Sequence, residues 1–207
     1  ARRLGCDCYL EYSDVPENSR TEQPELVIAE QVKQALKENR FKIAFQPVVS
    51  AVTGEVNFYE GLVRMIDKEG QPIAAGGFVP VIEQMGLMRL IDRKVLDLGL
   101  DALENNPEMN LSINVSGMTA VDPVWLRRLE ERLQDRLDIA SRLIVEITET
   151  VALDDINESS RFVSSLTKFG CRVALDNFGA GFTSFRHLRA LNVALVKIDG
   201  SFVRGIT

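Results

Sequence analysis

The sequence predicts an α/β fold, a (β/α) barrel with an antiparallel first strand whose last strands are missing from this chain. Short apolar runs of strand character alternate with segments of helical spacing, which is the pattern of a parallel sheet. A hairpin precedes this alternation. Six strands are expected in about 180 residues, whereas a closed eight-unit barrel needs roughly 250. We therefore expect this chain to be part of a longer protein.

Composition limits the function classes. Hydrophobic residues make up 45% of the 207 residues, and the formal net charge is −6. No broad basic field would hold a nucleic-acid polymer. No apolar run approaches the length of a membrane span, so we expect no membrane contact from this segment.

Three cysteines suggest no disulfide framework, so we expect a reducing, cytoplasmic location, with an upstream membrane anchor in the parent protein left open. Cys6 and Cys8 could form half of a metal site, but neither a second pair nor a histidine cluster accompanies them.

The first part of the chain predicts a linker and then a hairpin. Residues 1–24 lack clear patterning and are interpreted as a linker or the tail of an upstream domain, with the barrel domain over 25–207. Helical spacing predicts an amphipathic helix over 25–39. The runs 41–50 and 56–65 are predicted as strands, and their short connection makes them an antiparallel pair.

The rest of the chain predicts alternating helices and strands after a glycine-rich loop at 67–77. An aspartate–proline pair is expected to start the helix that follows the third strand. The expected helices are 78–85, 89–103, 122–137, 154–169 and 182–191, and the expected strands are 111–116, 143–148, 173–175 and 193–198.

Five successive strands each carry a polar residue at or near the carboxyl end: Glu60, Asn114, Glu146, Asp176 and Lys197. In a parallel barrel these ends converge on the face that carries active sites. Carboxylate and amide oxygens suit Mg²⁺ or Mn²⁺, which bind phosphate oxygens and activate water. A nearby lysine can hold water or phosphate, and Arg64 on the face of Glu60 offers a phosphate clamp.

Each of these residues also has an ordinary structural interpretation. Glu60 could form a salt bridge at the rim, and Asn114 could cap the end of its strand. Lys197 and Asp199 could form a surface ion pair, and the glycines of 179–181 could serve a tight turn. The repetition over five strands favours a metal-dependent phosphate enzyme or a binder of a phosphate ligand, and leaves both open.

Six motifs in order resemble the EAL domain, a bacterial family that hydrolyses cyclic di-GMP to linear pGpG. They are Gln46-Pro47, Glu60-Gly61-Leu62-Val63-Arg64, Asn114-Val115-Ser116, Glu146-Ile147-Thr148-Glu149, Asp176-Asn177-Phe178-Gly179-Ala180-Gly181-Phe182-Thr183-Ser184 and Lys197-Ile198-Asp199. Residues 2–7 also resemble the end of a GGDEF (diguanylate cyclase) domain, which often precedes EAL.

The resemblance implies a modified TIM barrel and a site with assigned roles. The implied ligands of a first metal ion, Mg²⁺ or Mn²⁺, are Glu60, Asn114, Glu146 and Asp176. Lys197 would position the attacking water, and Gln46 and Arg64 would contact cyclic di-GMP. Glu149 would brace the loop 177–184, which in the family couples the site to dimerisation, so a homodimer through the barrel is expected. Glu60, Glu149 and Lys197 form the implied catalytic set.

Three departures from the family pattern leave the activity open. Gly61 replaces the alanine of the signature, and we expect little effect from it. Asn177 replaces an aspartate that helps to hold a second metal, and an amide is the weaker ligand. The last family motifs lie beyond residue 207. The alternatives are an active phosphodiesterase, an inactive cyclic di-GMP receptor, and a scaffold that has lost both metal and ligand.

Overall fold

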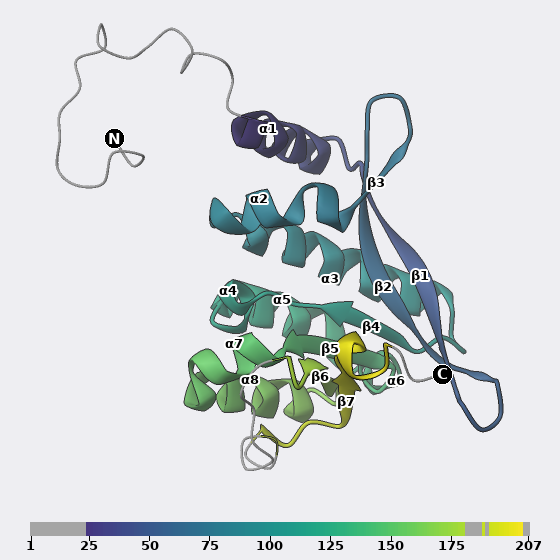
Figure 1. Cartoon of the computed structure of the whole chain (residues 1–207). Helices are drawn as coiled ribbons and strands as arrows, with labels where there is room; N and C mark the ends of the chain where they lie inside the picture. Colours follow the sequence, from purple (N-terminus) through teal and green to yellow (C-terminus); the bar gives the residue numbers. More distant parts are fainter. Residues whose placement is uncertain (1–23, 181–187, 189–190, 205–207) are drawn as a thin grey trace, which may run out of the picture.

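The computed structural model describes residues 24–180, 188 and 191–204. A mixed sheet has the helices gathered along one side (Figure 1). The strands are β1 (Phe41–Val49), β2 (Val56–Ile66), β3 (Pro72–Ala74), β4 (Leu111–Asn114), β5 (Leu143–Thr148), β6 (Arg172–Phe178) and β7 (Leu195–Ile198). The α-helices are α1 (Pro24–Lys37), α2 (Val79–Gln84), α3 (Met88–Asn105), α4 (Gly117–Ala120), α5 (Pro123–Leu133), α6 (Leu137–Ala140), α7 (Glu149–Asp154) and α8 (Ile156–Lys168). Short 3-10 helices are η3 (Ala75–Gly77) and η4 (Gly200–Phe202).

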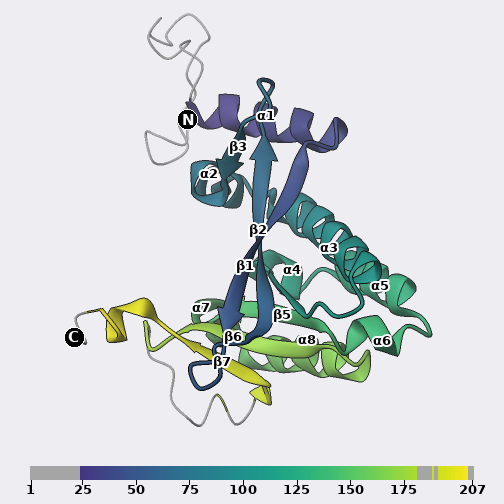
Figure 2. The ribbon, with the colours of Figure 1, turned by 90° about the vertical axis from the view of Figure 1, so that its right-hand side faces the viewer.

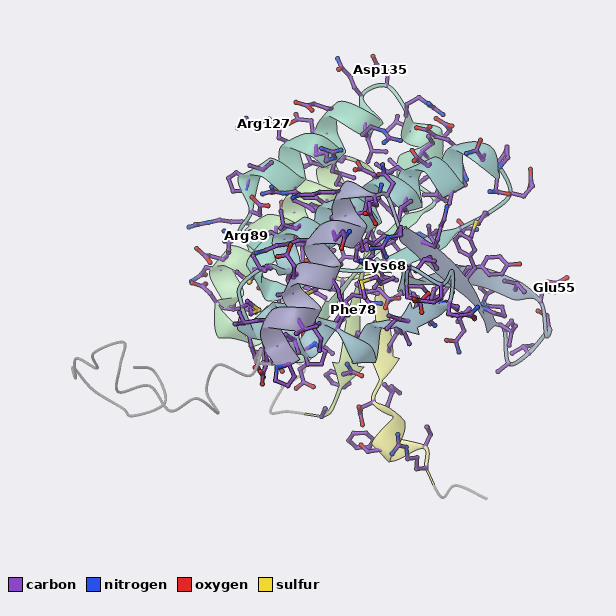
Figure 3. All side chains as sticks on the ribbon, turned by 90° about the horizontal axis from the view of Figure 1, so that it is seen from above. Glu55, Lys68, Phe78, Arg89, Arg127 and Asp135 are labelled. Atoms are coloured by element: carbon purple, nitrogen blue, oxygen red, sulfur yellow. The ribbon has the colours of Figure 1, made fainter. Side chains whose placement is uncertain are left out.

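The first two strands form the expected antiparallel hairpin. Phe41 lies opposite Met65, and the register continues to Val48 opposite Phe58 before an irregularity. Gly54 has a φ of +74° in the connecting turn, a conformation that glycine adopts without steric cost. The long hairpin passes in front of β5–β7 in Figure 2, and Glu55 marks its tip in Figure 3, far from Arg89 and Arg127 on the helical layer.

The remaining long strands confirm the predicted parallel sheet. The order is β1-β2-β4-β5-β6-β7, with β2 through β7 parallel along this path and β3 paired antiparallel to β2. Within the described residues β1 and β7 stand at the two ends of the path, so the sheet is open. This is the predicted barrel with an antiparallel first strand, without its closing strands.

Several elements differ from the predictions. The loop 67–77 contains the short strand β3, because Pro72–Ala74 pairs with the end of β2. The helix predicted over 122–137 ends earlier, at Leu133, because Asp135 has a φ of +60° that no helix continues through, and the short helix α6 begins at Leu137. The predicted strand 111–116 ends at Asn114, since α4 begins at Gly117 with Ser116 as its N-cap. Helix α7 was not predicted.

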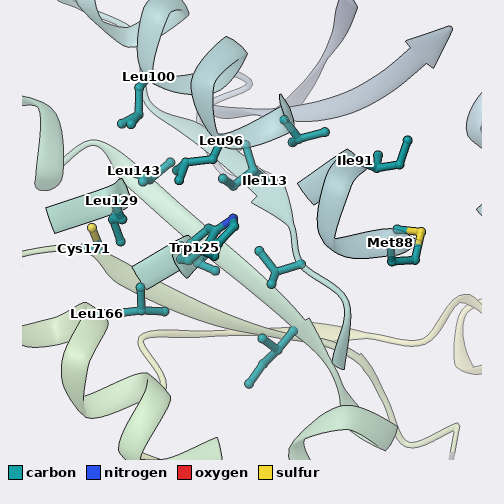
Figure 4. Close-up of a cluster of buried hydrophobic side chains, with 14 of the residues drawn as sticks. Met88, Ile91, Leu96, Leu100, Ile113, Trp125, Leu129, Leu143, Leu166 and Cys171 are labelled. Atoms are coloured by element: carbon teal, nitrogen blue, oxygen red, sulfur yellow. The ribbon is translucent and has the colours of Figure 1, made fainter. Parts of the chain in front are cut away.

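The core lies between the sheet and the helices. Trp125 of α5 is fully buried, and its ring lies 5.9 Å from that of Phe162 on α8. Figure 4 shows Trp125 amid side chains from α3, β4 and β5, including Leu96, Ile113 and Leu143. This core holds the sheet rigid behind the strand ends that carry the candidate site.

No helix of the described chain is long and apolar enough to span a membrane. The helix predicted over 182–191 falls almost entirely outside the described residues, as do Cys6, Cys8 and nearly all of the predicted linker. The domain boundary at residue 25 therefore stays a prediction.

Candidate functional site

Three of the five predicted strand-end residues, all carboxylates, meet directly at a fourth, Lys197. The Nζ of Lys197 lies 2.6 Å from Oε2 of Glu146, 2.9 Å from Oε2 of Glu60 and 3.5 Å from Oδ1 of Asp176. Asn114 joins the cluster through its Nδ2, which donates to Oε1 of Glu60 over 3.0 Å. We call these five residues the carboxylate–lysine cluster.

The strand register explains why residues far apart in sequence converge here. Asn114 on β4 lies beside Glu146 on β5, and Asp176 on β6 lies beside Thr148, two residues further along β5. Side chains alternate across a strand, so residues separated by even numbers face the same side. Glu60 corrects one expectation, because it lies in the middle of β2 rather than near its carboxyl end.

The cluster carries an excess of negative charge. Three carboxylates surround one ammonium group. Burial raises the pKa of Glu146, and the hydrogen bond from Lys197 only partly opposes this effect. Burial alone would lower the pKa of Lys197, but hydrogen bonds to Glu146 and Glu60 outweigh it, and the pKa is raised. Lys197 is therefore charged at neutral pH, and the cluster remains net anionic.

The donor set fits a hard divalent cation. Its predicted ligands are oxygen atoms, and the Oε1 of Glu146 is buried without a hydrogen-bond partner among the described residues. An orphaned buried carboxylate oxygen is costly unless something binds it. In the described part of the chain, no three His, Cys, Asp or Glu side chains are grouped as a metal site, and the Nζ of Lys197 lies among the carboxylates.

Glu149 begins α7 directly after β5 and holds the next loop. It is 3% exposed, and its Oε2 accepts a hydrogen bond of 2.7 Å from the backbone N–H of Gly179. Gly179 has a φ of +94°, and a Cβ added there would lie 2.6 Å from the ring of Phe202. The positive φ therefore favours glycine here, and a Cβ would in addition displace the ring of Phe202.

Asn177 corrects a second expectation, because it belongs to β6 and not to the following loop. The β6–β7 register shifts between Leu175 and Phe178, and Asn177 has a φ of +57° in this irregularity. Asparagine tolerates the left-handed conformation better than most residues. The irregularity leaves the Asn177 side chain exposed, next to the half-buried Asp176.

The two predicted ligand-binding residues flank the cluster without joining it. Gln46 on β1 lies opposite Glu60 and is exposed. Nη1 of Arg64 donates to the carbonyl of Val63 over 2.9 Å. Among the described residues, no hydrogen bond connects Gln46 or Arg64 to the carboxylates.

Two residues beside the cluster were not identified from the sequence. Ser112 is fully buried on β4, opposite Ile144 and thus two strand positions from the level of Glu146, and its hydroxyl has no hydrogen-bond partner among the described residues. Asp92 on α3 is 3% exposed and bonds to the segment that follows Asn114. Asp92 lay on a helix with ordinary amphipathic spacing, so nothing in the sequence marked its carboxylate as buried.

An apolar cavity of about 300 Å³ opens next to Asn114. Its lining includes Leu62 on β2, Val79 and Glu83 on α2, and Ser116. Its size and walls suit a flat ring system, with polar groups at the edge that could set its orientation.

Comparison with known proteins identifies the family. The model of the EAL domain matches residues 29–207. The chain belongs to the EAL domain family. An EAL relative, the cyclic di-GMP phosphodiesterase PdeF of Escherichia coli, is 33% identical over 182 residues, which cover 84% of this chain and 24% of PdeF. This chain thus spans about a quarter of that protein.

Solved EAL structures share the fold. The EAL domain of FimX from Pseudomonas aeruginosa, bound to c-di-GMP, superposes with a TM-score of 0.76 at 29% identity and covers 86% of this chain and 74% of that one. The PaMucR phosphodiesterase in complex with c-di-GMP gives the same TM-score and coverage at 27% identity. The part of this chain that superposes therefore corresponds to about three quarters of the length of each of those chains.

Proposed function

We propose that this EAL domain is a metal-dependent phosphodiesterase that hydrolyses cyclic di-GMP to linear pGpG. The observation that carries the proposal is the carboxylate–lysine cluster, in which three carboxylates and an amide from four strands converge around Lys197. The choice of substrate is supported by the similarity of this chain to PdeF, which is named a cyclic di-GMP phosphodiesterase.

The chain's own residues supply binding and positioning. We assign Glu60, Asn114, Glu146 and Asp176 to one divalent cation, Mg²⁺ or Mn²⁺. Such an ion, when bound, neutralises phosphate charge and makes a nearby water more acidic. Lys197 carries three donors at this point and would hold the water or a phosphate oxygen in line with the scissile bond.

The remaining residues bind the dinucleotide and fix the loop. Arg64 would pair with a phosphate group of the bound dinucleotide. Gln46, on the β1–β2 hairpin, would form a hydrogen bond to the same ligand. Glu149 holds Gly179, three residues after Asp176, through its buried carboxylate. We expect the active form to be a homodimer through the barrel, and the free, buried thiol of Cys171 fits a cytoplasmic location.

The alternative is a receptor that binds cyclic di-GMP without turnover. Asn177 favours it, because an amide is a weaker ligand than a carboxylate for a second cation. Substituting Asn177→Asp separates the two alternatives: a sharp rise in turnover identifies this position as the defect. Both residues tolerate the observed φ of +57°, so the change tests the ligand and not the backbone.

The test is incubation of the full-length protein with cyclic di-GMP and Mg²⁺ or Mn²⁺, followed by chromatography for pGpG. Metal-dependent product that disappears in Glu60→Ala supports the phosphodiesterase. Tight binding by calorimetry without product supports the receptor. If the protein shows neither binding nor product, both the phosphodiesterase and the receptor are overturned. A scaffold that has lost metal and ligand would then remain.

A further inference from the structure

We infer that Asp92 is a positioning residue for the metal-binding face, acting through the segment that follows Asn114. The inference rests on the proposed function, in which Asn114 is a metal ligand. Asp92 lies on α3, which is packed against the outside of the sheet, and is not part of the carboxylate–lysine cluster.

One oxygen of Asp92 receives three hydrogen bonds, two from Ser116, the N-cap of α4, and one from Thr119 within that helix. Its Oδ2 accepts from Ser116 Oγ at 2.5 Å, from Thr119 Oγ1 at 2.7 Å and from the Ser116 backbone N–H at 3.1 Å. Asp92 is 3% exposed and Thr119 is fully buried. A charged acceptor with three short donors is a strong, geometrically defined tie.

The cost of this arrangement argues that it does more than fill space. Burial raises the pKa of the Asp92 carboxyl, and the bonds from Ser116 and Thr119 oppose that rise. A buried acid on a core helix is unfavourable unless its partners fix it. An apolar side chain would pack here without that cost, but it would leave the donors of Ser116 and Thr119 unpaired.

The tied segment lies immediately after a proposed metal ligand. Asn114 is the last residue of β4, and Ser116 follows two residues later as the N-cap of α4. Between them, the Val115 N–H donates to the Glu146 carbonyl over 2.9 Å. The backbone on the carboxyl side of Asn114 is thus held from β5 and from α3, which limits the positions that its amide can take.

The same tie reaches the neighbouring helix. A Cβ added at Gly117 would lie 3.1 Å from a methyl of Val151, so α4 sits tightly against α7. Helix α7 carries Glu149 at its first position. A looser α4 would therefore disturb the two sides of the site that Asn114 and Glu149 define.

Arg93 provides the matched control. It also ties α3 to the region after α4, through Nη2 to Asp122 Oδ2 at 2.6 Å, and among the described residues it makes no hydrogen bond to Ser116. Arg93→Ala should cost stability without changing the position of Asn114. Asp92→Asn is the conservative rescue, because an amide oxygen can still accept from the same donors.

The experiment measures Mn²⁺ affinity, cyclic di-GMP affinity and amide hydrogen exchange on the full-length protein. Asp92→Ala should weaken Mn²⁺ binding about tenfold or more, which is the effect of removing other groups that orient metal ligands. The same substitution should also remove the protection of the Ser116 backbone amide against hydrogen exchange. Asp92→Asn should stay within about threefold of wild type. Arg93→Ala should unfold more easily and bind Mn²⁺ normally.

Contrary results have separate meanings. Wild-type protein that takes up no Mn²⁺ and no cyclic di-GMP overturns the proposed function, and the positioning role falls with it. Normal wild-type binding with unchanged affinity in folded Asp92→Ala, or an equal loss in Arg93→Ala, overturns the positioning role alone. If Asp92→Ala does not fold, Thr119→Val removes one donor, and unchanged Mn²⁺ affinity in that variant overturns the inference.

Discussion

Replacing Lys197 with methionine should destabilise the metal-free protein. The ammonium lies within 3.5 Å of three carboxylates, one of which, Glu146, has a side chain that is 0% exposed. Breaking a fully buried ion pair from one side costs about 3–5 kcal/mol. The Lys197 and Glu60 side chains are 27% and 19% exposed, so water screens part of this cost. We expect a loss of about 2 kcal/mol.

The assay is urea unfolding at pH 7.5 in the presence of EDTA. Lys42→Met, at an exposed lysine of β1, is the control and should change the unfolding free energy by less than about 0.5 kcal/mol. Adding Glu146→Gln to Lys197→Met should recover much of the loss, because the uncompensated buried charge is gone. Saturating Mg²⁺ or Mn²⁺ should stabilise Lys197→Met more than wild type. A loss below about 0.5 kcal/mol for Lys197→Met would refute the electrostatic reasoning.

Three further predictions concern single residues. Gly179→Ala should lower the unfolding free energy measured in urea by about 1–3 kcal/mol, because of the positive φ and because the new Cβ would lie 2.6 Å from a ring carbon of Phe202. The loss should exceed that of Gly54→Ala, where φ is also positive but nothing lies within 4 Å of the new Cβ. Equal losses in the two variants would contradict the steric contribution. Burial would raise the pKa of Asp122, but bonds from Arg93 and from the first turn of α5 outweigh it and lower the pKa. The stability that Asp122 contributes is thus present above about pH 4 and lost as the pH falls through its folded pKa. The difference in unfolding free energy between wild type and Asp122→Asn, about 1 kcal/mol, should therefore shrink from pH 5 to pH 3. A difference that stays constant over this range would argue against a contribution from the charge. Burial raises the pKa of Cys171 to about 12, so a thiol reagent at pH 8 should label it only after unfolding, in protein whose other two cysteines are serine; labelling of the native protein within seconds would exclude this burial.

The convergence of the cluster was predictable because parallel strands bring their ends together. Isolated charges between β-branched residues, as at Glu146 and Lys197, are rarely placed in a strand without a partner. The contact itself, however, cannot be predicted from the hydrophobic pattern of the sequence. That Lys197 contacts Glu146 at 2.6 Å depends on the register of the three strands β5, β6 and β7, which the hydrophobic pattern alone leaves undetermined.

The missed features share a physical cause, which is tertiary context. Strand β6 continues through Asp176 and Asn177 because β7 pairs alongside it with an irregular register, although the apolar run stops at Leu175. Helix α7 is short and capped by Thr148, so local propensity could not distinguish it from a loop. Asp92 was not singled out from the sequence, since its donor Ser116 lies 24 residues away along the chain.

The central claim is that the carboxylate–lysine cluster binds a divalent cation beside cyclic di-GMP. A crystal structure of the full-length protein with Mn²⁺ and cyclic di-GMP, recorded with anomalous scattering, tests it most directly. We expect a manganese peak ligated by Glu60, Asn114, Glu146 and Asp176, with a phosphate of the ligand against it and Lys197 within hydrogen-bond distance of that phosphate or a water. A bound dinucleotide with no manganese among these residues, and Lys197 still bridging the carboxylates, would contradict it.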